Sequence, residues 1–381
     1  MGDEGVKRRR SRIAGISPAS ACRRTDCQLK RRWLTWRLFG LAYERILAMN
    51  ILVTGGAGYV GSHAIKRLVG AGHKVVVIDN LVYGHRAAVG DTPLGVGDLS
   101  DRPLVEKLLA EHAIEAVMHF AAYAYVGESV TDPAKYYQNN IVGTLSLLDA
   151  MVATGVKKLV FSSTCATYGE PTTVPIPEDH PQSPINPYGF TKLVIEHAMA
   201  DYRRAYGLSY AALRYFNASG AAADGTIGED HKPETHLIPL VLDVALGKRE
   251  HITVFGDDYP TADGTCIRDY IHVDDLGDAH VAAIEKLGAG DDGEPVELRV
   301  NVGTGNGASV REVIAACEKA TGKPIAVVDV RRREGDPLEL VADPYGAERL
   351  LGWRAKHTDI NETVASAWRW HESHPDGYAD R

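Results

Sequence analysis

The chain has 381 residues, of which 45% are hydrophobic and 24% are charged, a composition typical of a globular protein with room for two domains. Its formal net charge of −8 argues against a nucleic-acid-binding surface. The sequence contains no run of 18 apolar residues, which argues against a membrane span.

The first 48 residues differ in charge from the rest of the chain. They carry 12 Lys and Arg against 4 Asp and Glu, a net charge of +8 that leaves −16 for the remainder. Their basic clusters surround no clean apolar core, so a secretory signal is not indicated. We expect a leader outside the fold, either a tail or translated sequence upstream of a natural start at Met49. An organelle transit peptide and an amphipathic helix in "RRWLTWRLFGLAYERILA" are the alternatives.

The cysteines indicate neither a metal site nor a disulfide framework. They stand at positions 22, 27, 165, 266 and 317, which matches no zinc-binding spacing. We therefore expect a reducing, cytoplasmic location and no metal.

Short apolar strands alternate with helical segments from Asn50 onward. The expected strands cover residues 51–55, 74–79, 116–122, 158–163 and 210–217, and the first helix covers 62–70. Continuous Val, Ile and Leu runs separated by helices are typical of a parallel sheet covered on both faces. Because such crossovers are right-handed, we expect a doubly wound Rossmann sheet over residues 49–216.

The periodicity becomes irregular after residue 217. Helices are expected at 237–247, 275–287 and 309–320, with a strand and turn at 300–305, among loops such as "ASGAAADGTIGEDHKPETHLIP". We expect residues 217–381 to form a smaller α/β domain that binds the substrate over the carboxyl edge of the sheet, with boundaries interleaved between the two domains.

A glycine-rich turn, "TGGAGYVG", connects the first strand to the first helix. Gly55, Gly58 and Gly61 allow a tight turn and a close approach of the backbone to a pyrophosphate at the helix N-terminus. Asp79, at the end of the second strand, can accept hydrogen bonds from an adenosine ribose, and its charge would repel a 2′-phosphate. The pattern predicts NAD rather than NADP as the cofactor. Asp98 is placed either to meet the adenine or to cap the helix that follows it.

Hydroxyl side chains end the strand that carries "FSSTCATYGE". The carboxyl end of such a strand faces the ligand crevice, so Thr164 can bind a substrate hydroxyl. The alternative is that Ser162, Ser163 and Thr164 only satisfy backbone groups in a turn.

The stretch "NPYGFTK" places Lys192 four residues after Tyr188, on one face of a predicted helix. An ammonium beside the phenol would lower the pKa of Tyr188 from its usual value of about 10. A tyrosine tuned in this way can take a proton from an alcohol near neutral pH. An ordinary surface helix is the alternative, but a strand-end hydroxyl, a tyrosine and a lysine together predict a catalytic triad.

These motifs resemble the extended short-chain dehydrogenase/reductase family and, within it, the UDP-glucose 4-epimerases. The resemblance runs from Asn50 to about Asp376 and rests on "TGGAGYVGSH", "DNL", "HFAAYAYVGESV", "YYQNN", "FSSTCATYGEP", "NPYGFTK", "LRYFN", "DYPTADGTCIRDYIHVDDL" and "RRREGDP". It implies a reaction without net redox change. In that reaction Tyr188 takes the proton of the sugar 4-hydroxyl, NAD+ takes hydride from C4, the 4-keto sugar rotates, and hydride returns to the opposite face. Lys192 would bind the nicotinamide ribose and depress the pKa of Tyr188.

The resemblance also assigns site residues. Those implied at the cofactor are Gly55, Gly58, Tyr59, Val60, Gly61, Asp79, Asn80, Asp98, Leu99, Phe120, Ala121, Asn139, Ser162, Tyr188, Lys192 and Tyr215. Those implied at the UDP-sugar substrate are Thr164, Tyr188, Asn217, His236, Leu237, Phe255, Arg268, Arg333, Asp336 and Leu340. Guanidinium groups suit the diphosphate because they form charge-assisted, often bidentate bonds with phosphate oxygens. By the same resemblance we expect a homodimer paired through helices of the sheet domain.

Four positions depart from the family pattern. Ala124 stands where some relatives have Lys, so one cofactor contact is expected to be missing or replaced. Thr164 replaces Ser and keeps the hydroxyl, and His236 replaces an Asn that contacts the diphosphate in some relatives. Leu340 replaces a Tyr beside the sugar, which would enlarge the sugar pocket. We therefore hypothesise that UDP-N-acetylhexosamines are also accepted.

Other functions on the same fold are less well supported. Nucleotide-sugar 4,6-dehydratases need an Asp-Glu pair where this chain has Cys165 and Ala166, and UDP-glucuronate decarboxylases usually have a Glu in this segment. Epimerases of UDP-xylose and UDP-arabinose share "FSSTCATYGEP", so a pentose substrate stays open. A non-catalytic NAD-binding regulator is disfavoured because the complete triad would serve no purpose in it.

Overall fold

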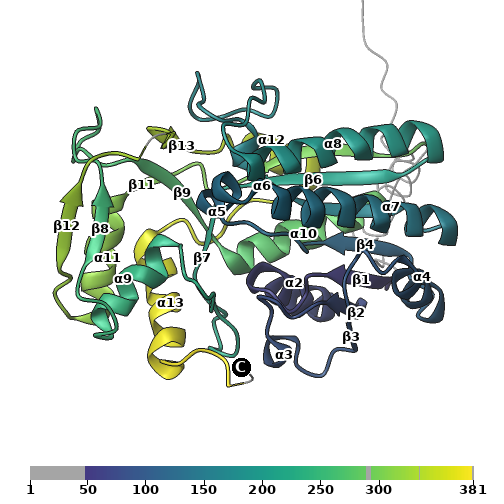
Figure 1. Ribbon diagram of the computed structural model, residues 1–381, viewed down its shortest axis with the longest axis horizontal. Coiled ribbons are helices and arrows are strands. Elements are labelled where there is room, and N and C mark those ends of the chain that lie inside the picture. The colour runs from purple at the N-terminus through teal and green to yellow at the C-terminus, as the bar shows by residue number, and fades with distance from the viewer. Residues whose placement is uncertain (1–47, 289–292, 334, 380–381) are drawn as a thin grey trace, which may run out of the picture. The chain divides into compact units, whose positions relative to one another are not determined.

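Seven parallel strands form the central sheet of the computed structural model, which describes residues 48–288, 293–333 and 335–379 (Figure 1). The expected leader, residues 1–48, lies outside the described residues except for Ala48. In spatial order the strands are β10 (Glu297–Val302), β6 (Ser209–Tyr215), β5 (Lys158–Thr164), β4 (Ala116–His119), β1 (Asn50–Thr54), β2 (Lys74–Asp79) and β3 (Leu94–Val96). The doubly wound parallel sheet predicted from the sequence is confirmed.

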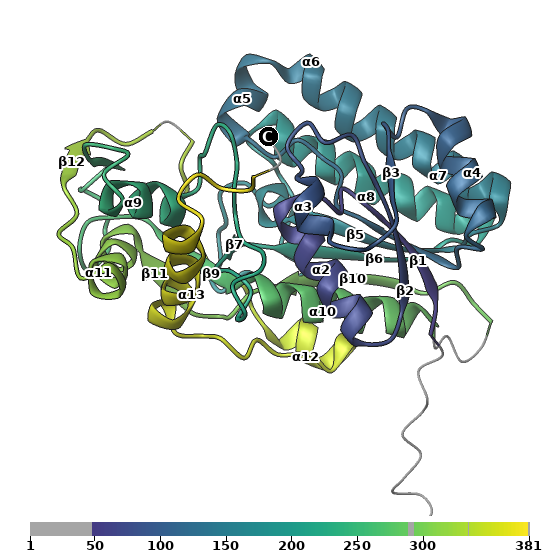
Figure 2. The same cartoon turned by 90° about the horizontal axis from the view of Figure 1, so that it is seen from below.

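Helices cover both faces of this sheet (Figure 2). On one face lie α2 (Tyr59–Gly70), α3 (Arg86–Val89), α10 (Val273–Gly288) and α12 (Tyr345–Leu351). On the other lie α4 (Arg102–Glu111), α7 (Gly143–Thr154) and α8 (Pro187–Tyr206), with the short segments α5 (Val126–Thr131), α6 (Pro133–Tyr136), η1 (Tyr137–Val142) and η2 (Cys165–Thr167) nearby.

Alternation along the strands explains why both faces need helices. Ile51 and Val53 point into the core with α2 and α10, whereas Leu52 points into the core with α4, α7 and α8. All three side chains are fully buried, and burying a side chain of this size contributes roughly 1.5–3 kcal/mol. A strand buried on both faces must therefore be apolar at every position.

A second group of elements lies beside the sheet. Its strands are β7 (Asn217–Ser219), β8 (Ile252–Phe255), β9 (Ile267–His272), β11 (Gly307–Ser309), β12 (Val327–Val330) and β13 (Glu339–Leu340). β9 pairs with β7, β11 and β13, and β8 pairs with β12. Its helices α9 (Leu237–Ala245), α11 (Val310–Thr321) and α13 (Ile360–Ser373) share a third apolar core.

Some predicted strands end elsewhere than expected. The strand expected over 116–122 stops at His119, because the amides of Phe120 and Ala121 both donate to the Thr54 carbonyl oxygen and turn the chain. The strand expected over 210–217 divides at Phe216 into β6 and β7. The strand expected over 300–305 begins at Glu297 and joins the central sheet beside β6.

The segment α10–β10 therefore returns to the first part of the chain, so the two parts are interleaved in sequence. Among residues 48–288, 293–333 and 335–379, no helix combines the length and the apolar character that a membrane crossing requires. The sheet reverses its winding between β1 and β4, and in such sheets ligands bind outside the carboxyl ends of the strands at this reversal.

Candidate active site

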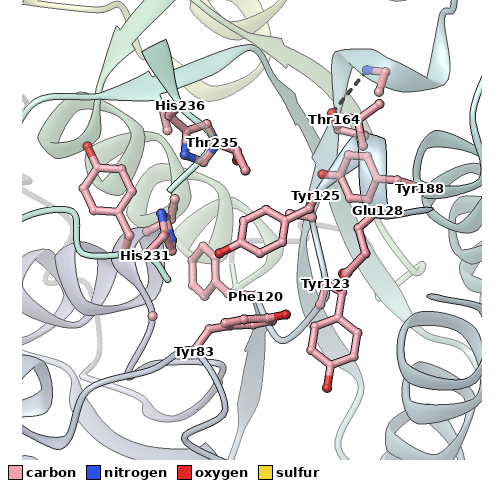
Figure 3. A pocket seen from close by; sticks show the side chains of 18 of the residues that line it. Tyr83, Phe120, Tyr123, Tyr125, Glu128, Thr164, Tyr188, His231, Thr235 and His236 are labelled. Atoms are coloured by element: carbon pink, nitrogen blue, oxygen red, sulfur yellow. Dashed lines mark hydrogen bonds between the residues drawn. The ribbon is translucent and has the colours of Figure 1, made fainter. Parts of the chain in front are cut away.

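A cavity of about 800 Å³ opens at the reversal point of the sheet. Its lining combines the turns after β1, β2, β4 and β5 with loops from the second group of elements. Thr164 and Tyr188 lie on one side, His231, Thr235 and His236 lie on the other, and Tyr125 lies between them (Figure 3). This volume is in the range that suits small-molecule and cofactor sites.

The glycine turn forms one wall of the cavity from backbone atoms. Gly55 has a φ of +70°, and a Cβ there would lie 2.5 Å from the Ala121 amide nitrogen. A Cβ on Gly61 would lie 2.3 Å from the Gly55 carbonyl oxygen, so helix α2 packs directly against the turn. Gly58 caps α2 without a side-chain hydrogen bond and lines the cavity. Backbone amides at a helix start are thereby available to an anionic ligand, and this cradle fits the pyrophosphate of a dinucleotide.

Asp79 supports the same turn. Its Oδ2 accepts from the Ala57 amide at 3.0 Å and its Oδ1 accepts from the Leu81 amide at 2.8 Å. Burial raises the pKa of this carboxyl group, although both amide bonds oppose the shift. Asp79 also lines the cavity. The residue expected to bind the ribose therefore also holds the glycine turn in place through its two amide bonds.

Of the two readings of Asp98, the helix cap is wrong. Asp101 is the cap of α4 and accepts from the Leu104 amide at 3.2 Å. Asp98 instead accepts from the Ser100 amide and from the Asn80 side chain, at 2.9 and 3.0 Å. Asp98 and Asn80 both line the cavity, where the adenosine was expected.

Tyr188 occupies its position because of how α8 begins. Asn186 caps the helix by accepting from the Gly189 amide at 2.8 Å, and Pro187 stands at the first helical position. Tyr188 is 7% exposed and lines the cavity beside Thr164. The Thr164 hydroxyl accepts from the Ala166 amide at 3.2 Å, so it satisfies a turn and also faces the ligand space.

The expectation that Lys192 lowers the pKa of Tyr188 is wrong for this structure. Burial raises the pKa of Tyr188 well above its usual value, reinforced by Tyr215 and opposed by a hydrogen bond with Thr164. The Lys192 ammonium donates to the Ser162 carbonyl oxygen at 2.8 Å and lies 5.9 Å from the centre of the Tyr188 ring. Burial also lowers the pKa of Lys192, to about 7. Desolvation disfavours the charged form of each group and is the largest cause of both shifts.

The neighbouring hydroxyls divide into two roles. The Ser162 hydroxyl is 2.8 Å from the Tyr215 hydroxyl, which itself borders the cavity. Ser163 donates to the buried Glu196 at 2.6 Å and therefore serves packing. The expected alternative, that these hydroxyls satisfy backbone groups in a turn, holds for Thr164, which accepts from the Ala166 amide, and not for Ser163, whose partner is a side chain.

The predicted diphosphate ligands meet at one carboxylate. Arg268 donates to one Asp336 oxygen at 3.0 Å, and Arg333 donates to the other oxygen through two nitrogens, at 3.0 and 3.2 Å. All three residues line the cavity. The Arg333 guanidinium also lies 4.6 Å from the centre of the Phe255 ring. Two cations are therefore concentrated beside the ligand space.

His236 lies among acidic side chains at the opposite wall. Its Nδ1 is 2.7 Å from a Glu229 oxygen and 3.3 Å from a Glu234 oxygen. Burial by itself would lower the pKa of His236, but the two carboxylates raise it well above its usual value. His231 adjoins it, with ring centres 5.3 Å apart.

Most of the predicted site residues border the cavity, and four do not. Ser162 and Lys192 lie one layer beneath the lining and contact it through Tyr215 and Tyr188. Phe255 lies under Arg333, and Leu237 packs against the apolar core of the second group. The lining residues among the predictions are Gly55, Gly58, Tyr59, Val60, Gly61, Asp79, Asn80, Asp98, Leu99, Phe120, Ala121, Asn139, Thr164, Tyr188, Tyr215, Asn217, His236, Arg268, Arg333, Asp336 and Leu340.

An aromatic cluster in the lining was not nominated from the sequence. The rings of Tyr83, Tyr123 and Tyr125 meet edge to face, with centres 5.4 Å and 5.3 Å apart. Lys135 donates to the Tyr83 hydroxyl and lies 4.5 Å from the Tyr123 ring centre. The segment "HFAAYAYVGESV" was the available signal, because its spaced tyrosines follow a strand end.

Comparisons with known proteins identify a family and similar relatives. The model of the NAD dependent epimerase/dehydratase family matches residues 51–303. A UDP-glucose 4-epimerase from Halalkalibacterium halodurans is 52% identical over 331 residues, which cover 87% of this chain and 98% of that protein.

Two solved structures are similar over nearly their whole length. A UDP-glucose 4-epimerase from Brucella ovis in complex with NAD has a TM-score of 0.82 and 51% identity, covering 84% of this chain and 98% of that one. A UDP-glucose-4-epimerase from Stenotrophomonas maltophila, with bound NAD and formylated UDP-arabinopyranose, has a TM-score of 0.82 and 43% identity, covering 86% and 99%. The resemblance drawn from the motifs is confirmed.

Proposed function

The chain belongs to the NAD dependent epimerase/dehydratase family, and we propose on this premise that it interconverts UDP-glucose and UDP-galactose by inverting the sugar at C4. The observation that carries the proposal is the meeting of Thr164 and Tyr188 with the glycine turn at one cavity. Relatives at about 50% identity over most of the chain bear the name of that activity.

The residues of the glycine turn would hold the cofactor. Gly55, Gly58 and Gly61 offer the backbone cradle for the pyrophosphate, and Asp79 would accept from the adenosine ribose. NAD supplies the oxidation at C4 and the reduction that follows it. The lining tyrosines and Phe120 give the same space an aromatic wall.

Tyr188 and Thr164 would handle the proton of the sugar 4-hydroxyl. Both are buried at the cavity wall, so a hydroxyl placed between them replaces water as the hydrogen-bond partner. Tyr188 would accept the proton and later return it, and Thr164 would orient the hydroxyl. Because burial raises the pKa of Tyr188, a protonated Lys192 beneath it is needed to stabilise the phenolate.

Arg268 and Arg333 would hold the diphosphate of the substrate. In the structure both guanidinium groups donate hydrogen bonds to the Asp336 carboxylate. Substrate phosphates would share these donors, while Asp336 remains available to a ribose hydroxyl. Holding the nucleotide firmly leaves the sugar as the part that can turn within the cavity.

We also propose a homodimer and a cytoplasmic location. Exposed apolar side chains gather on the adjoining segments η1, α7 and α8: Tyr137, Val142, Val152, Phe190 and Tyr206. An apolar surface on neighbouring helices suits pairing with a second copy. Cys165, Cys266 and Cys317 are buried free thiols, as a reducing compartment would allow.

The test is to incubate the purified full chain with UDP-galactose without added cofactor and to follow UDP-glucose by chromatography. We expect conversion to an equilibrium mixture of the two UDP-sugars. Because no cofactor is added, this result would also mean that the purified chain retains NAD from the host cell. UDP-xylose and UDP-N-acetylglucosamine serve as competing substrates. No conversion of UDP-galactose even with NAD+ added, together with turnover of either competitor, would overturn the proposed hexose specificity.

A further inference from the structure

The loop between β7 and α9 brings together four metal-ligating side chains, and we propose that Glu229, His231, Glu234 and His236 bind one divalent transition-metal ion, with Zn²⁺ the best match. One donor atom from each residue lies within 4.8 Å of all the others. His231 and His236 line the same cavity as Tyr188 but on its opposite wall, and the proposed metal binding does not depend on the proposed function.

The spacing of the donor atoms is that of ligands around one ion. Glu229 Oε1 is 2.7 Å from His236 Nδ1 and 3.2 Å from His231 Nδ1. His231 Nδ1 is 3.7 Å from Glu234 Oε2. Tetrahedral Zn²⁺ holds nitrogen and oxygen ligands at roughly 2.0–2.2 Å, which separates neighbouring ligands by roughly 3.3–3.6 Å. The observed distances bracket this value.

The key atoms lack hydrogen-bond partners, which is the second observation. Glu229 is 4% exposed, yet its Oε1 has no hydrogen-bond partner among the described residues. The Nδ1 atoms of His231 and His236 are also inaccessible and without a hydrogen bond, although both lie close to that oxygen. The groups therefore approach one another without the alignment that a hydrogen bond requires. Convergence on a shared ion satisfies all three atoms at once.

The fourth ligand is oriented by the backbone. Glu234 Oε1 accepts from the amides of Thr235 and His236 at 2.7 and 2.8 Å. These bonds fix the carboxylate and leave Oε2, which lies 3.7 Å from His231 Nδ1, free to ligate an ion. A ligating carboxylate held by outer hydrogen bonds is a regular feature of metal sites.

The donor set favours zinc over harder ions. Two imidazole nitrogens with two carboxylate oxygens suit Zn²⁺, whereas Mg²⁺ and Ca²⁺ prefer oxygen ligands alone. Four protein ligands indicate a structural rather than a catalytic ion. The competing interpretation is that the two histidines are protonated and form a charge-balanced cluster with the two carboxylates.

The position of the cluster gives the ion a structural consequence. The His231 ring meets the Tyr59 and Tyr125 rings edge-on, each at 6.2 Å between centres. Tyr59 belongs to the glycine turn, and its hydroxyl donates to the Gly220 carbonyl oxygen at 2.7 Å. An ion at this place would clamp the loop against the wall where the cofactor is proposed to bind. The expectation of no metal rested on the cysteine spacing alone, whereas the four proposed ligands all lie in the segment "EDHKPETH".

The test measures metal binding and stability rather than turnover. The full chain is stripped with a chelator and titrated with ZnCl2 by calorimetry, and zinc content is measured by mass spectrometry after desalting. One zinc per chain is expected in the wild type. His231→Ala and Glu229→Gln should weaken zinc binding at least about tenfold. His112→Ala is the control, because His112 is an exposed residue at the end of α4, and this variant should bind zinc as the wild type does. Zinc should raise the thermal midpoint only where it binds.

A measurement without variants covers the case in which they fail to fold. Co²⁺ added to the stripped wild type should give visible absorption typical of a tetrahedral site, and one equivalent of ZnCl2 should bleach it. Binding that is equal in the wild type and His231→Ala, or no visible Co²⁺ spectrum and no zinc retained, would overturn the metal site. Either result would favour the proton-balanced cluster.

Discussion

Thr164 and Tyr188, the two side chains proposed to act on the sugar hydroxyl, are each only 7% exposed. Their burial decides the electrostatics, since it raises the pKa of Tyr188 and lowers that of Lys192 to about 7. The local spacing of Tyr188 and Lys192 on one helix face was readable from the sequence. The direction of the Lys192 ammonium toward Ser162 was not, because it depends on β5 passing beneath α8.

Replacing Tyr188 by Phe tests its proton-transfer role at the residue scale. The variant should lose at least about a hundredfold in kcat, which is the usual contribution of a positioned acid or base. Its ring should still pack, so NAD retention, measured by absorbance after denaturation, should be unchanged. Tyr345→Phe is the control because Tyr345 is 71% exposed at the start of α12, and it should keep full turnover. Near-normal activity of Tyr188→Phe would refute the assignment.

At the scale of elements, the turn between β1 and α2 combines packing with ligand binding. The glycines differ in what an added methyl group would contact. At Gly61 it would clash with backbone atoms, and at Gly58 it would make an ordinary contact of 3.4 Å with the Gly55 carbonyl oxygen. At Gly70 it would enter open space. Sequence spacing alone assigns Gly58 and Gly61 the same role. Only the packing of α2 on the turn separates a structural glycine from one that faces the cavity.

Alanine at these three positions should give three different outcomes. Gly61→Ala should lower the thermal midpoint, because its Cβ would lie 2.3 Å from the Gly55 carbonyl oxygen. Gly58→Ala should leave the midpoint of the stripped protein near that of the wild type but weaken NAD binding in calorimetry. Gly70→Ala, near the end of α2, is the control and should change neither. Equal stability loss at Gly58 and Gly61 would contradict the division.

A buried ion pair ties α8 to the central sheet. Arg214 on β6 donates to Glu196 on α8 through Nε at 3.0 Å and Nη2 at 2.6 Å, and both residues are at most 2% exposed. Burial raises the pKa of Glu196, but Arg214 outweighs this and lowers it below its usual value. Because the folded-state pKa is lowered, the stabilisation is present at neutral pH and is lost as the pH falls through that pKa.

Arg214→Met should therefore lower the free energy of unfolding by about 3–5 kcal/mol near neutral pH, since it leaves Glu196 buried without its partner. The difference from the wild type should shrink as the pH falls through the lowered pKa of Glu196, because the ion pair is lost when Glu196 becomes protonated. Urea unfolding at several pH values measures this. Arg102→Met removes an exposed pair with Glu106 and should have little effect. A pH-independent difference would show that packing, and not charge, is the cause.

At the scale of the whole molecule, the segment from α10 to β10 returns to the central sheet, so the two parts share one folding unit. Arg268, Arg333 and Asp336 belong to the second part, whereas the glycine turn and Tyr188 belong to the first. The cavity exists only where both parts meet, which explains why the substrate residues could be named from family motifs but not placed relative to one another.

The proposed homodimer is testable by mass. Light scattering after size-exclusion chromatography should give twice the mass of one chain. Phe190→Glu places a charge on the apolar surface of α8, where Phe190 is 44% exposed, and should shift the mass toward one chain on dilution. Val82→Glu, at a loop position that is 55% exposed, is the control. A single-chain mass for the wild type would contradict the dimer.

The amino-acid sequence is enough to predict the parallel sheet, the glycine turn and the placement of Tyr188 and Lys192 on one helix face, because apolar runs, glycine spacing and i,i+4 spacing act over short distances. Tertiary structure alone decided the pKa directions, the sharing of Asp336 by two arginines, the tyrosine cluster and the convergence of Glu229, His231, Glu234 and His236. Those properties depend on burial and on distances between groups that only the folded chain brings together.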